Sequence, residues 1–450
     1  MSRAADYFRE IRPTVTLALP IVIGQVSQML MGVIDSAMIG HAGTVPLAAA
    51  AFAIHIFNLF YVLGIGVMIP VSIYVSRARG AAQPAEAAEY LRHGVALAVG
   101  IGAVETLLMF ALSTQFAWFG QPPEVLAIVQ PFFLVFAGSI TPVLIYLALR
   151  QFSEAMGHPW APMFILLGSV ALNAGLNWVL IYGNLGAPAL GLLGAGISTL
   201  VARTVDAAVT WLWLRRDPAV RAAWPRRWWG NYSRARFYEM LHVGLPAAGM
   251  LLFEASAFAF SGIMIGWLGA VPLAAHQIAI SCASLAFMFP LGISMAAGMR
   301  VSHAVGAGQN ERLRPIAFGA MGLGVAVMAF FALAFGFGGG VIATWFVEDR
   351  VVLALATQLL VVAALFQLVD GTQVIGASAL RAITDVRVPA IITFAAYWVI
   401  ALPLAYALGV RGSFGAVGVW SGIASGLAFA AVFLTVRFAR LTRAPRPLRC

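Results

Sequence analysis

The chain has 450 residues, of which 62% are hydrophobic and 10% are charged, and its formal net charge is +10. Most apolar residues fall in uninterrupted runs of membrane-spanning length, which excludes a water-soluble globule. All the basic residues are arginines spread over many polar breaks, and this argues against one basic face for nucleic acid.

Twelve apolar runs of about 20 residues follow one another, separated by short polar breaks. They lie at 14–39, 51–75, 93–114, 128–149, 161–182, 190–214, 240–267, 277–299, 316–346, 353–380, 389–408 and 415–436. The runs predict an all-α polytopic membrane protein with twelve transmembrane helices. The first run is too long for a signal-peptide core, so we expect residues 1–13 to remain as a tail.

The arginines predict the orientation in the membrane. If both termini are cytoplasmic, all but three of the 27 arginines fall on the cytoplasmic side, and the exceptions are Arg203, Arg350 and Arg411. Because short cytoplasmic loops carry an excess of basic residues, this pattern supports the orientation. The arginine-, alanine- and glycine-rich usage is typical of a GC-rich bacterial source, so we expect a multi-pass protein of the bacterial inner membrane.

The chain contains an internal repeat. Sliding residues 19–83 forward by 226 positions, without a gap, matches Leu19-Pro20 to Leu245-Pro246 and Val45–Ala49 to Val271–Ala275. About a third of the window is identical, and the period is half of the chain.

Each copy of the repeat holds six spans, so both copies enter and leave the membrane on the same side. This arrangement predicts two six-helix lobes related by a pseudo-two-fold axis along the membrane normal, with a substrate cleft between them. We place an N-lobe at 1–214, a cytoplasmic linker at 215–238 and a C-lobe at 239–450.

An acidic residue inside a predicted span requires an explanation, because its insertion into the membrane has an unfavourable free energy of about 2.5 to 3.5 kcal/mol. Five are present: Asp35, Glu105, Asp206, Glu254 and Asp370. Arg203 precedes Asp206 by three residues on the same helical face, and we expect these two to pair. Glu105 has no partner that the sequence identifies, and its role stays open.

The N-lobe carries further polar residues within its spans. Gln28 and Asp35 share one face of the first span, because seven residues are close to two helical turns. Asn173 and Asn177 lie one turn apart in the fifth span, and Ser198 with Thr199 lies in the sixth. Such residues serve either as hydrogen bonds between helices or as parts of a site, and both interpretations stay open.

The repeat aligns Gln28 with Glu254 and Asp35 with Ser261. Each lobe therefore carries one carboxylate and one neutral polar group on an equivalent face, but the carboxylates lie at different heights. The asymmetry predicts two unequal sites, one in each lobe.

A second group of polar residues surrounds Asp370, which is flanked by Gln367 and Gln373 in the tenth span. Carboxylate and amide oxygens are hard ligands. This group predicts a site for a proton or a sodium ion.

Motifs that the sequence lacks exclude one source of energy for transport, the hydrolysis of ATP. Without a lysine the chain cannot contain the phosphate-binding motif G-x-x-x-x-G-K-[ST] of ATPases, so an ion gradient is the remaining common source. The two cysteines, Cys282 and Cys450, form no metal-binding or disulfide pattern. We therefore expect no cofactor besides a coupling ion, Na+ or H+.

Over residues 14–438 the sequence resembles the multidrug and toxic compound extrusion (MATE) family, and its NorM-type bacterial branch in particular. The motifs are Leu19-Pro20 through Asp35–Gly40, Asn173–Trp178 with Tyr182-Gly183 and Ala187-Pro188, Gly244–Pro246 through Glu254, Pro290–Gly292, Arg300-Val301 with Gly306–Gly308, Asp370 with Gln373, Leu380-Arg381 with Asp385, and Tyr397-Trp398 with Leu402-Pro403.

The resemblance implies antiport of cationic or amphipathic drugs and dyes out of the cytoplasm, driven by inward flow of Na+ or H+. It places Asp35 with Asn173 and Asn177 in an N-lobe site, and Glu254 with Asp370 in a C-lobe cation site. We expect a monomer whose partners are small molecules and the lipid bilayer.

Two other classes of membrane protein share some of these features. A flippase for lipids or lipid-linked sugars should line its cleft with several arginines, yet Arg203 is the one arginine inside a predicted span. An integral-membrane enzyme would need a reactive cluster, and the sequence holds no H-x-x-x-x-D, H-E-x-x-H or G-x-S-x-G. We therefore expect a transporter and not an enzyme.

Overall fold

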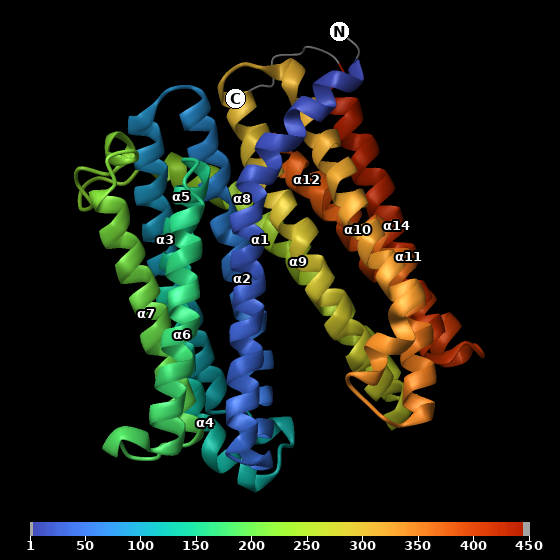
Figure 1. Ribbon diagram of the computed structural model, residues 1–450. Coiled ribbons are helices and arrows are strands. Elements are labelled where there is room, and N and C mark those ends of the chain that lie inside the picture. Colours follow the sequence, from blue (N-terminus) through green and yellow to red (C-terminus); the bar gives the residue numbers. More distant parts are fainter. Residues whose placement is uncertain (1–2, 444–450) are drawn as a thin grey trace. The chain divides into compact units, whose positions relative to one another are not determined.

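The computed structural model describes the backbone of residues 3–443 and the side chains of residues 7–443. Cys450, noted above, lies outside these residues. The described residues form helices and no strand (Figure 1). The α-helices are α1 Arg3–His41, α2 Thr44–Gly80, α3 Pro84–Ser113, α4 Pro123–Gly138, α5 Ile140–Ala155, α6 Trp160–Tyr182, α7 Leu192–Arg216, α8 Arg234–Gly266, α9 Ala270–Gly306, α10 Leu313–Thr344, α11 Arg350–Ala382, α12 Arg387–Phe394, α13 Leu402–Ala405 and α14 Gly415–Leu441.

Shorter helical turns join these elements. Four are 3₁₀ turns: η1 Phe116–Phe119, η2 Asn184–Gly186, η3 Arg221–Ala223 and η4 Asn310–Arg312. Two are π-helical, η5 Ala395–Ala401 and η6 Tyr406–Arg411, and they alternate with α12 and α13.

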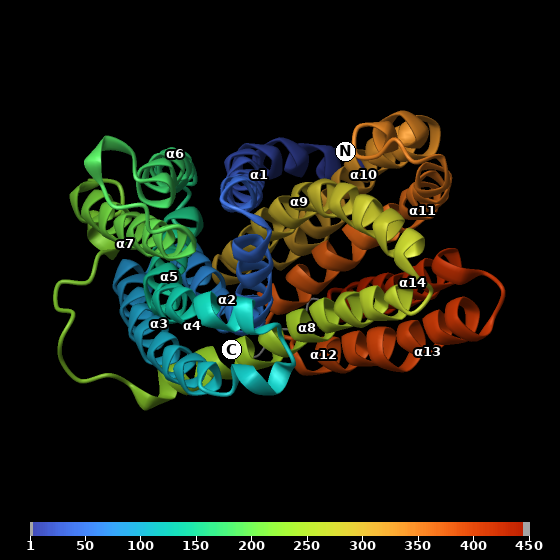
Figure 2. The same cartoon turned by 90° about the horizontal axis from the view of Figure 1, so that it is seen from below.

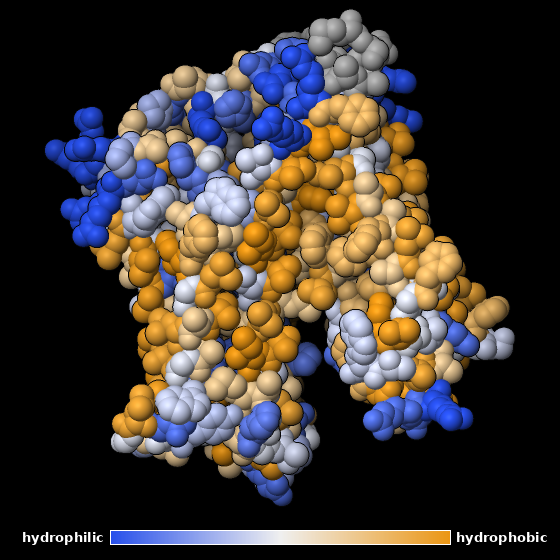
Figure 3. Space-filling view, viewed as in Figure 1, coloured by the Kyte–Doolittle hydropathy of each residue, from blue (hydrophilic) through white to orange (hydrophobic). Residues whose placement is uncertain are grey.

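In the described part of the chain, 12 helices or helix pairs are long and apolar enough to cross a membrane. The pair α4 and α5 forms one of them, Pro123–Ala155, and the series from α12 to η6 forms another, Arg387–Arg411. Each overlaps one predicted run, so the prediction of an all-helical, twelve-span membrane protein is confirmed. On the face drawn in Figure 3, hydrophobic residues cover the middle of the helices and hydrophilic residues gather at their ends.

The chain divides into two compact units. The N-unit is Ile23–Ala248, and the C-unit is Met1–Val22 together with Gly249–Cys450. In the N-unit, α2 packs against α3, α4 and α5, while α7 packs against α4, α5 and α6 (Figures 1 and 2). In the C-unit, α11 packs against α9, α10 and α14. Helix α11 therefore connects these other helices of the C-unit.

Both unit boundaries fall inside long helices, in α1 after Val22 and in α8 after Ala248. These two positions differ by 226, which is the offset of the sequence repeat. The first part of α1 thus belongs to the C-unit, and the first part of α8 belongs to the N-unit. The boundaries predicted from the sequence place α1 in the N-lobe and α8 in the linker and the C-lobe, so the exchange of helix ends is a feature of the tertiary structure.

Two glycines at equivalent repeat positions allow this packing. A Cβ atom on Gly66 would lie 2.2 Å from the Cα of Ala248, and one on Gly292 would lie 2.4 Å from Cγ2 of Val22. Residues 66 and 292 differ by 226, as do 22 and 248. In each unit, therefore, the second helix of a repeat meets the exchanged helix end at a distance that excludes a side chain.

Ion pairs also hold the exchanged helix ends, and their polarity is reversed between the units. In the C-unit, Glu10 on α1 pairs with Arg300 and with Arg312, at 3.0 Å for the latter. In the N-unit, Arg236 on α8 pairs with Glu86 at 2.8 Å. Position 10 plus 226 is 236, and position 86 plus 226 is 312. The repeat thus preserves the ion pair while exchanging its acid and its base.

Candidate functional site

Asp35 lies in a polar cluster of the N-unit, between α1 and α6. One of its carboxylate oxygens, Oδ1, accepts a hydrogen bond from Nδ2 of Asn177 at 2.6 Å. The same amide nitrogen lies 3.2 Å from Oδ1 of Asn173, and both asparagines are fully buried. The structure therefore brings together the three residues that the resemblance assigned to an N-lobe site.

Arg203, on α7, adds a positive charge to this region. Its guanidinium lies over the rings of Phe57 at 4.7 Å and Phe136 at 5.1 Å, a geometry that stabilises a cation. Arg203 is also near enough to interact electrostatically with Asp35. The Asp35 carboxylate is thus balanced by a neighbouring cation as well as by an amide.

Tyr61 connects the remaining N-lobe residue to this group. Gln28 donates through Nε2 to the Tyr61 hydroxyl at 2.9 Å, and the Arg203 guanidinium lies 6.0 Å from the centre of the Tyr61 ring. We call the set Gln28, Asp35, Tyr61, Asn173, Asn177 and Arg203 the N-unit cluster.

The predicted pair between Arg203 and Asp206 is present as an electrostatic interaction but not as a direct hydrogen bond. Arg203 donates instead to the Ser139 hydroxyl at 2.7 Å, and Asp206 accepts from the Ser169 hydroxyl at 2.9 Å. A spacing of three residues places two side chains on one helical face. It does not decide which neighbouring helix each side chain meets, and here the aromatic rings around Arg203 hold it elsewhere.

Ser198 and Thr199 are buried within α7 and bond to their own helix. Ser198 donates to the Gly194 carbonyl at 2.9 Å, and Thr199 donates to the Ala195 carbonyl at 3.0 Å. Their hydroxyl protons are therefore used locally, and a role in the N-unit cluster stays a prediction.

A second polar cluster lies in the C-unit and is centred on α11. Gln367, Asp370 and Gln373 are almost fully buried, with Asp370 only 4% exposed. Tyr397, from the π-helical turn η5, is also fully buried. These side chains make few hydrogen bonds. One of them is long, from Nε2 of Gln367 to the Ala283 carbonyl at 3.5 Å.

Four buried oxygen atoms of this group have no hydrogen-bond partner. They are Oε1 of Gln367, Oδ1 of Asp370, Oε1 of Gln373 and the hydroxyl oxygen of Tyr397. Each unsatisfied buried polar atom costs about 1 to 3 kcal/mol, so native proteins rarely keep several together. Carboxylate, amide and phenol oxygens suit a proton or a hard monovalent cation, and such a ligand would satisfy them.

Glu254, on α8, interacts electrostatically with this group. Its carboxylate is coupled to Asp370, to the Tyr397 hydroxyl and to Arg381 at the end of α11. Arg381 therefore balances one of the two carboxylates, Glu254, which leaves room for one further positive charge at Asp370. We call Glu254, Gln367, Asp370, Gln373, Arg381 and Tyr397 the C-unit cluster.

Ser261, the repeat partner of Asp35, donates to the carbonyl of Phe258 in its own helix at 2.7 Å. Its proton is used locally, as in Ser198 and Thr199, and its part in a cation site stays a prediction.

Glu105 is buried, and its Oε2 has no hydrogen-bond partner. In residues 7–443, no group of three or more His, Cys, Asp or Glu side chains is arranged to hold a metal ion.

The sequence arguments did not select Tyr61, Arg381 or Tyr397 as site residues. Tyr397 occurs in a motif that supports the family resemblance, but its position depends on the π-helical turn. Pro403 lies just beyond this turn and lacks a backbone N–H, which disturbs the regular α-helical bonding. Single π turns inside α-helices are frequent at functional sites, so a proline in the eleventh span is the signal that points to Tyr397.

Duplicated helices of membrane-spanning length, with buried carboxylates in both units, define a membrane transporter of the internal-repeat class. The comparisons with known proteins identify the family. The MatE family model matches residues 20–179 and 246–407, two segments whose first residues differ by 226.

Relatives that match over nearly their full length are named as multidrug resistance proteins. The chain is 33% identical to the probable multidrug resistance protein NorM of Rhizobium meliloti (strain 1021), over 96% of this chain and 94% of that protein. It is 34% identical to the multidrug resistance protein NorM of Burkholderia vietnamiensis, over 96% and 95%. The chain belongs to the MatE family, the MATE multidrug efflux transporters.

Solved structures of this family have the same fold. A MATE transporter of Vibrio cholerae, VcmN, matches with a TM-score of 0.90 at 20% identity, over 98% of both chains. The eukaryotic MATE transporter AtDTX14 matches with a TM-score of 0.84 at 21% identity, over 97% and 99%.

Proposed function

We propose that this protein is an antiporter of the bacterial inner membrane that exports cationic or amphipathic drugs and dyes in exchange for Na+ or H+. The names of the NorM relatives support drug export. The observation that carries the coupling proposal is the set of four unpartnered buried oxygens around Asp370. We expect the protein to act as a monomer, with both termini in the cytoplasm and without nucleic acid.

Charge neutralisation provides the coupling. An elementary charge that crosses 100 mV releases about 2.3 kcal/mol, and a buried carboxylate loses its charge when it binds a cation or a proton. Arg381 balances Glu254, so entry of one cation beside Asp370 balances the charge of the C-unit cluster. A state of the transporter that binds this cation more tightly is favoured by its binding, and alternating access then converts the ion gradient into drug export.

The N-unit cluster complements this site with a different chemistry. An amide donor and a nearby cation already stabilise the charged Asp35 carboxylate. A bound proton or ion would therefore stabilise Asp35 less than it would stabilise Asp370. Protonation of Asp35 would weaken the bond from Asn177 and would remove one of the two carboxylates that interact with Arg203. We propose that Asp35 changes its partners during the cycle, while Asp370 holds the coupling ion.

Proteoliposomes loaded with a fluorescent cationic dye test the proposal, with Na+ and H+ gradients imposed separately. The parent should export the dye against its gradient under one of the two, and Asp370→Asn should abolish gradient-driven export. Asp349→Asn is the matched control, because Asp349 caps the start of the same helix by accepting from the amides of Val351 and Val352 and asparagine caps equally well. The control should export like the parent.

Two results would contradict the proposal. One is equal gradient-driven export by Asp370→Asn and the parent, which would remove the C-unit cluster from coupling. The other is dye movement that responds to neither gradient in the parent, which would exclude antiport.

A further inference from the structure

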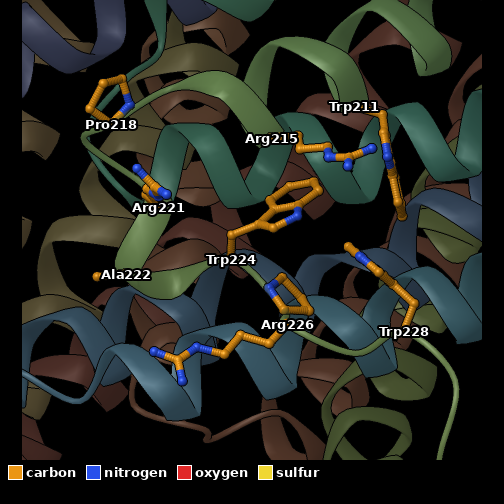
Figure 4. Close-up of a pocket in the computed structure, with 9 residues that line it drawn as sticks. Trp211, Arg215, Pro218, Arg221, Ala222, Trp224, Arg226 and Trp228 are labelled. Carbon is orange, nitrogen blue, oxygen red and sulfur yellow. The ribbon is translucent and has the colours of Figure 1, made fainter.

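The end of α7 and the segment that follows it line an open pocket of about 920 Å³ within the N-unit (Figure 4). Its walls come from the end of α7 and from residues 218–228, and they are Trp211, Arg215, Pro218, Arg221, Ala222, Trp224, Pro225, Arg226 and Trp228. The volume is within the range of about 300 to 1,000 Å³ that is usual for ligand pockets. None of these residues belongs to the N-unit cluster.

The charge of the pocket is positive and uncompensated. Arg215, Arg221 and Arg226 have exposed side chains, and no ion pair of the described residues includes them. Asp217 is the nearest acid in sequence, and its Oδ1 accepts a bond from the Ala219 amide at 2.9 Å. Three guanidinium groups are therefore available for an anion from outside the chain.

Tryptophans form the apolar part of the same pocket. The rings of Trp211 and Trp228 have centres 4.1 Å apart, and Trp224 packs against both at 5.3 Å. All three side chains are half-buried, so each leaves part of its ring available. Figure 4 draws Trp224 with Arg215, Arg221 and Arg226 on different sides of it. The pocket thus combines a rigid aromatic surface with three charged donors.

The position of α7 indicates the level of the pocket in the membrane. The membrane-spanning segment Leu192–Arg216 ends where the pocket begins, so the pocket lies at the membrane surface. Figure 3 shows hydrophilic residues gathered where α7 ends. Tryptophan is enriched at the level of the lipid headgroups, and clustered arginines next to a membrane span attract anionic lipids. A cationic drug would be repelled by the three arginines, so the pocket does not suit the exported substrate.

We propose that this pocket binds the headgroup of an anionic phospholipid, such as phosphatidylglycerol, from the leaflet at which α7 ends. The planar guanidinium groups bind the phosphate through paired N–H donors. The indole rings contact the glycerol and the start of the acyl chains, which a free, hydrated phosphate ion lacks. The bound lipid anchors the segment that connects the two repeats to the membrane surface.

Native mass spectrometry of the full-length protein in detergent measures the binding directly. Phosphatidylglycerol is titrated against phosphatidylcholine with the same acyl chains, and inorganic phosphate and glycerol phosphate are added as competitors. The pocket variant is R215Q/R221Q/R226Q. The control variant R216Q/R227Q/R234Q removes the same charge from the same segment, but these arginines do not line the pocket.

The parent and the control variant are expected to retain phosphatidylglycerol in preference to phosphatidylcholine. The pocket variant is expected to lose about fivefold in affinity per arginine, or about a hundredfold in all, since each basic residue near an anionic surface contributes about 1 kcal/mol. Thermal unfolding should show that both variants stay folded. If both lose binding equally, or the pocket variant loses none, the proposal is wrong. Displacement of the lipid by phosphate alone would also overturn it, because the site would then recognise a free anion.

Discussion

Replacing Glu10 with glutamine should destabilise the protein far more than replacing its repeat partner Arg236 with glutamine. Both residues hold an exchanged helix end by an ion pair at the same repeat position. They differ in burial, since the Glu10 side chain is 11% exposed and its partner Arg300 is 13% exposed. In the other pair, the Arg236 and Glu86 side chains are 22% and 41% exposed.

The magnitudes follow from this difference. Removing one member of a buried ion pair costs about 3 to 5 kcal/mol, because the remaining charge is left without a partner. Arg300 also donates to the Glu10 carbonyl and the Thr14 hydroxyl, and Arg312 is 43% exposed, so we expect the lower end, about 3 kcal/mol. The pair of Arg236 is closer to the surface, and screened pairs contribute about 0 to 1 kcal/mol.

Thermal unfolding of the purified variants in one detergent measures the difference. A change of 1 kcal/mol shifts the melting temperature by about 2 to 4 °C for a unit of this size. The expected loss is thus about 6 to 12 °C for Glu10→Gln and below about 4 °C for Arg236→Gln. Equal losses, or a larger loss for Arg236→Gln, would refute the claim that burial determines the strength of the two reversed pairs.

Three further predictions concern packing and the two clusters. Gly66→Ala should lower the melting temperature, since its Cβ would lie 2.2 Å from the Ala248 backbone, whereas Gly100→Ala has nothing within 4 Å and should not; equal effects would argue against the close approach. Tyr397→Phe removes a buried hydroxyl that interacts with Glu254 and Asp370, so it should weaken the dependence of dye export on the coupling ion, and unaltered ion dependence would exclude Tyr397 from the site. Asp35→Asn keeps an acceptor for Asn177 but loses the charge, so export should fall while the melting temperature is retained; full export would count against a role in transport.

Hydropathy is a local property, so the twelve spans could be located from the sequence, with ends within nine residues of the observed ones. The polar partners of Asp35 were also accessible, because Asn173 and Asn177 are spaced one turn apart and occur in a recognisable motif. Arg203 and Asp206 show that spacing along a helix does not predict the hydrogen-bond partners of a side chain. Their spacing is compatible with a pair, but packing against other helices directs each to a serine instead.

By itself, the sequence determined the membrane environment, the number of membrane spans, the 226-residue repeat and its family, since these depend on composition and on patterns along the chain. Tertiary structure alone decided which half of α1 and α8 belongs to which unit, and that Glu10 and Arg236 form reversed pairs. It also decided that Tyr397 lies near enough to Asp370 to interact with it, and that three arginines line one pocket. Such features require contacts between residues far apart in the chain, and spacing along a helix carries no information about which distant surface a side chain meets.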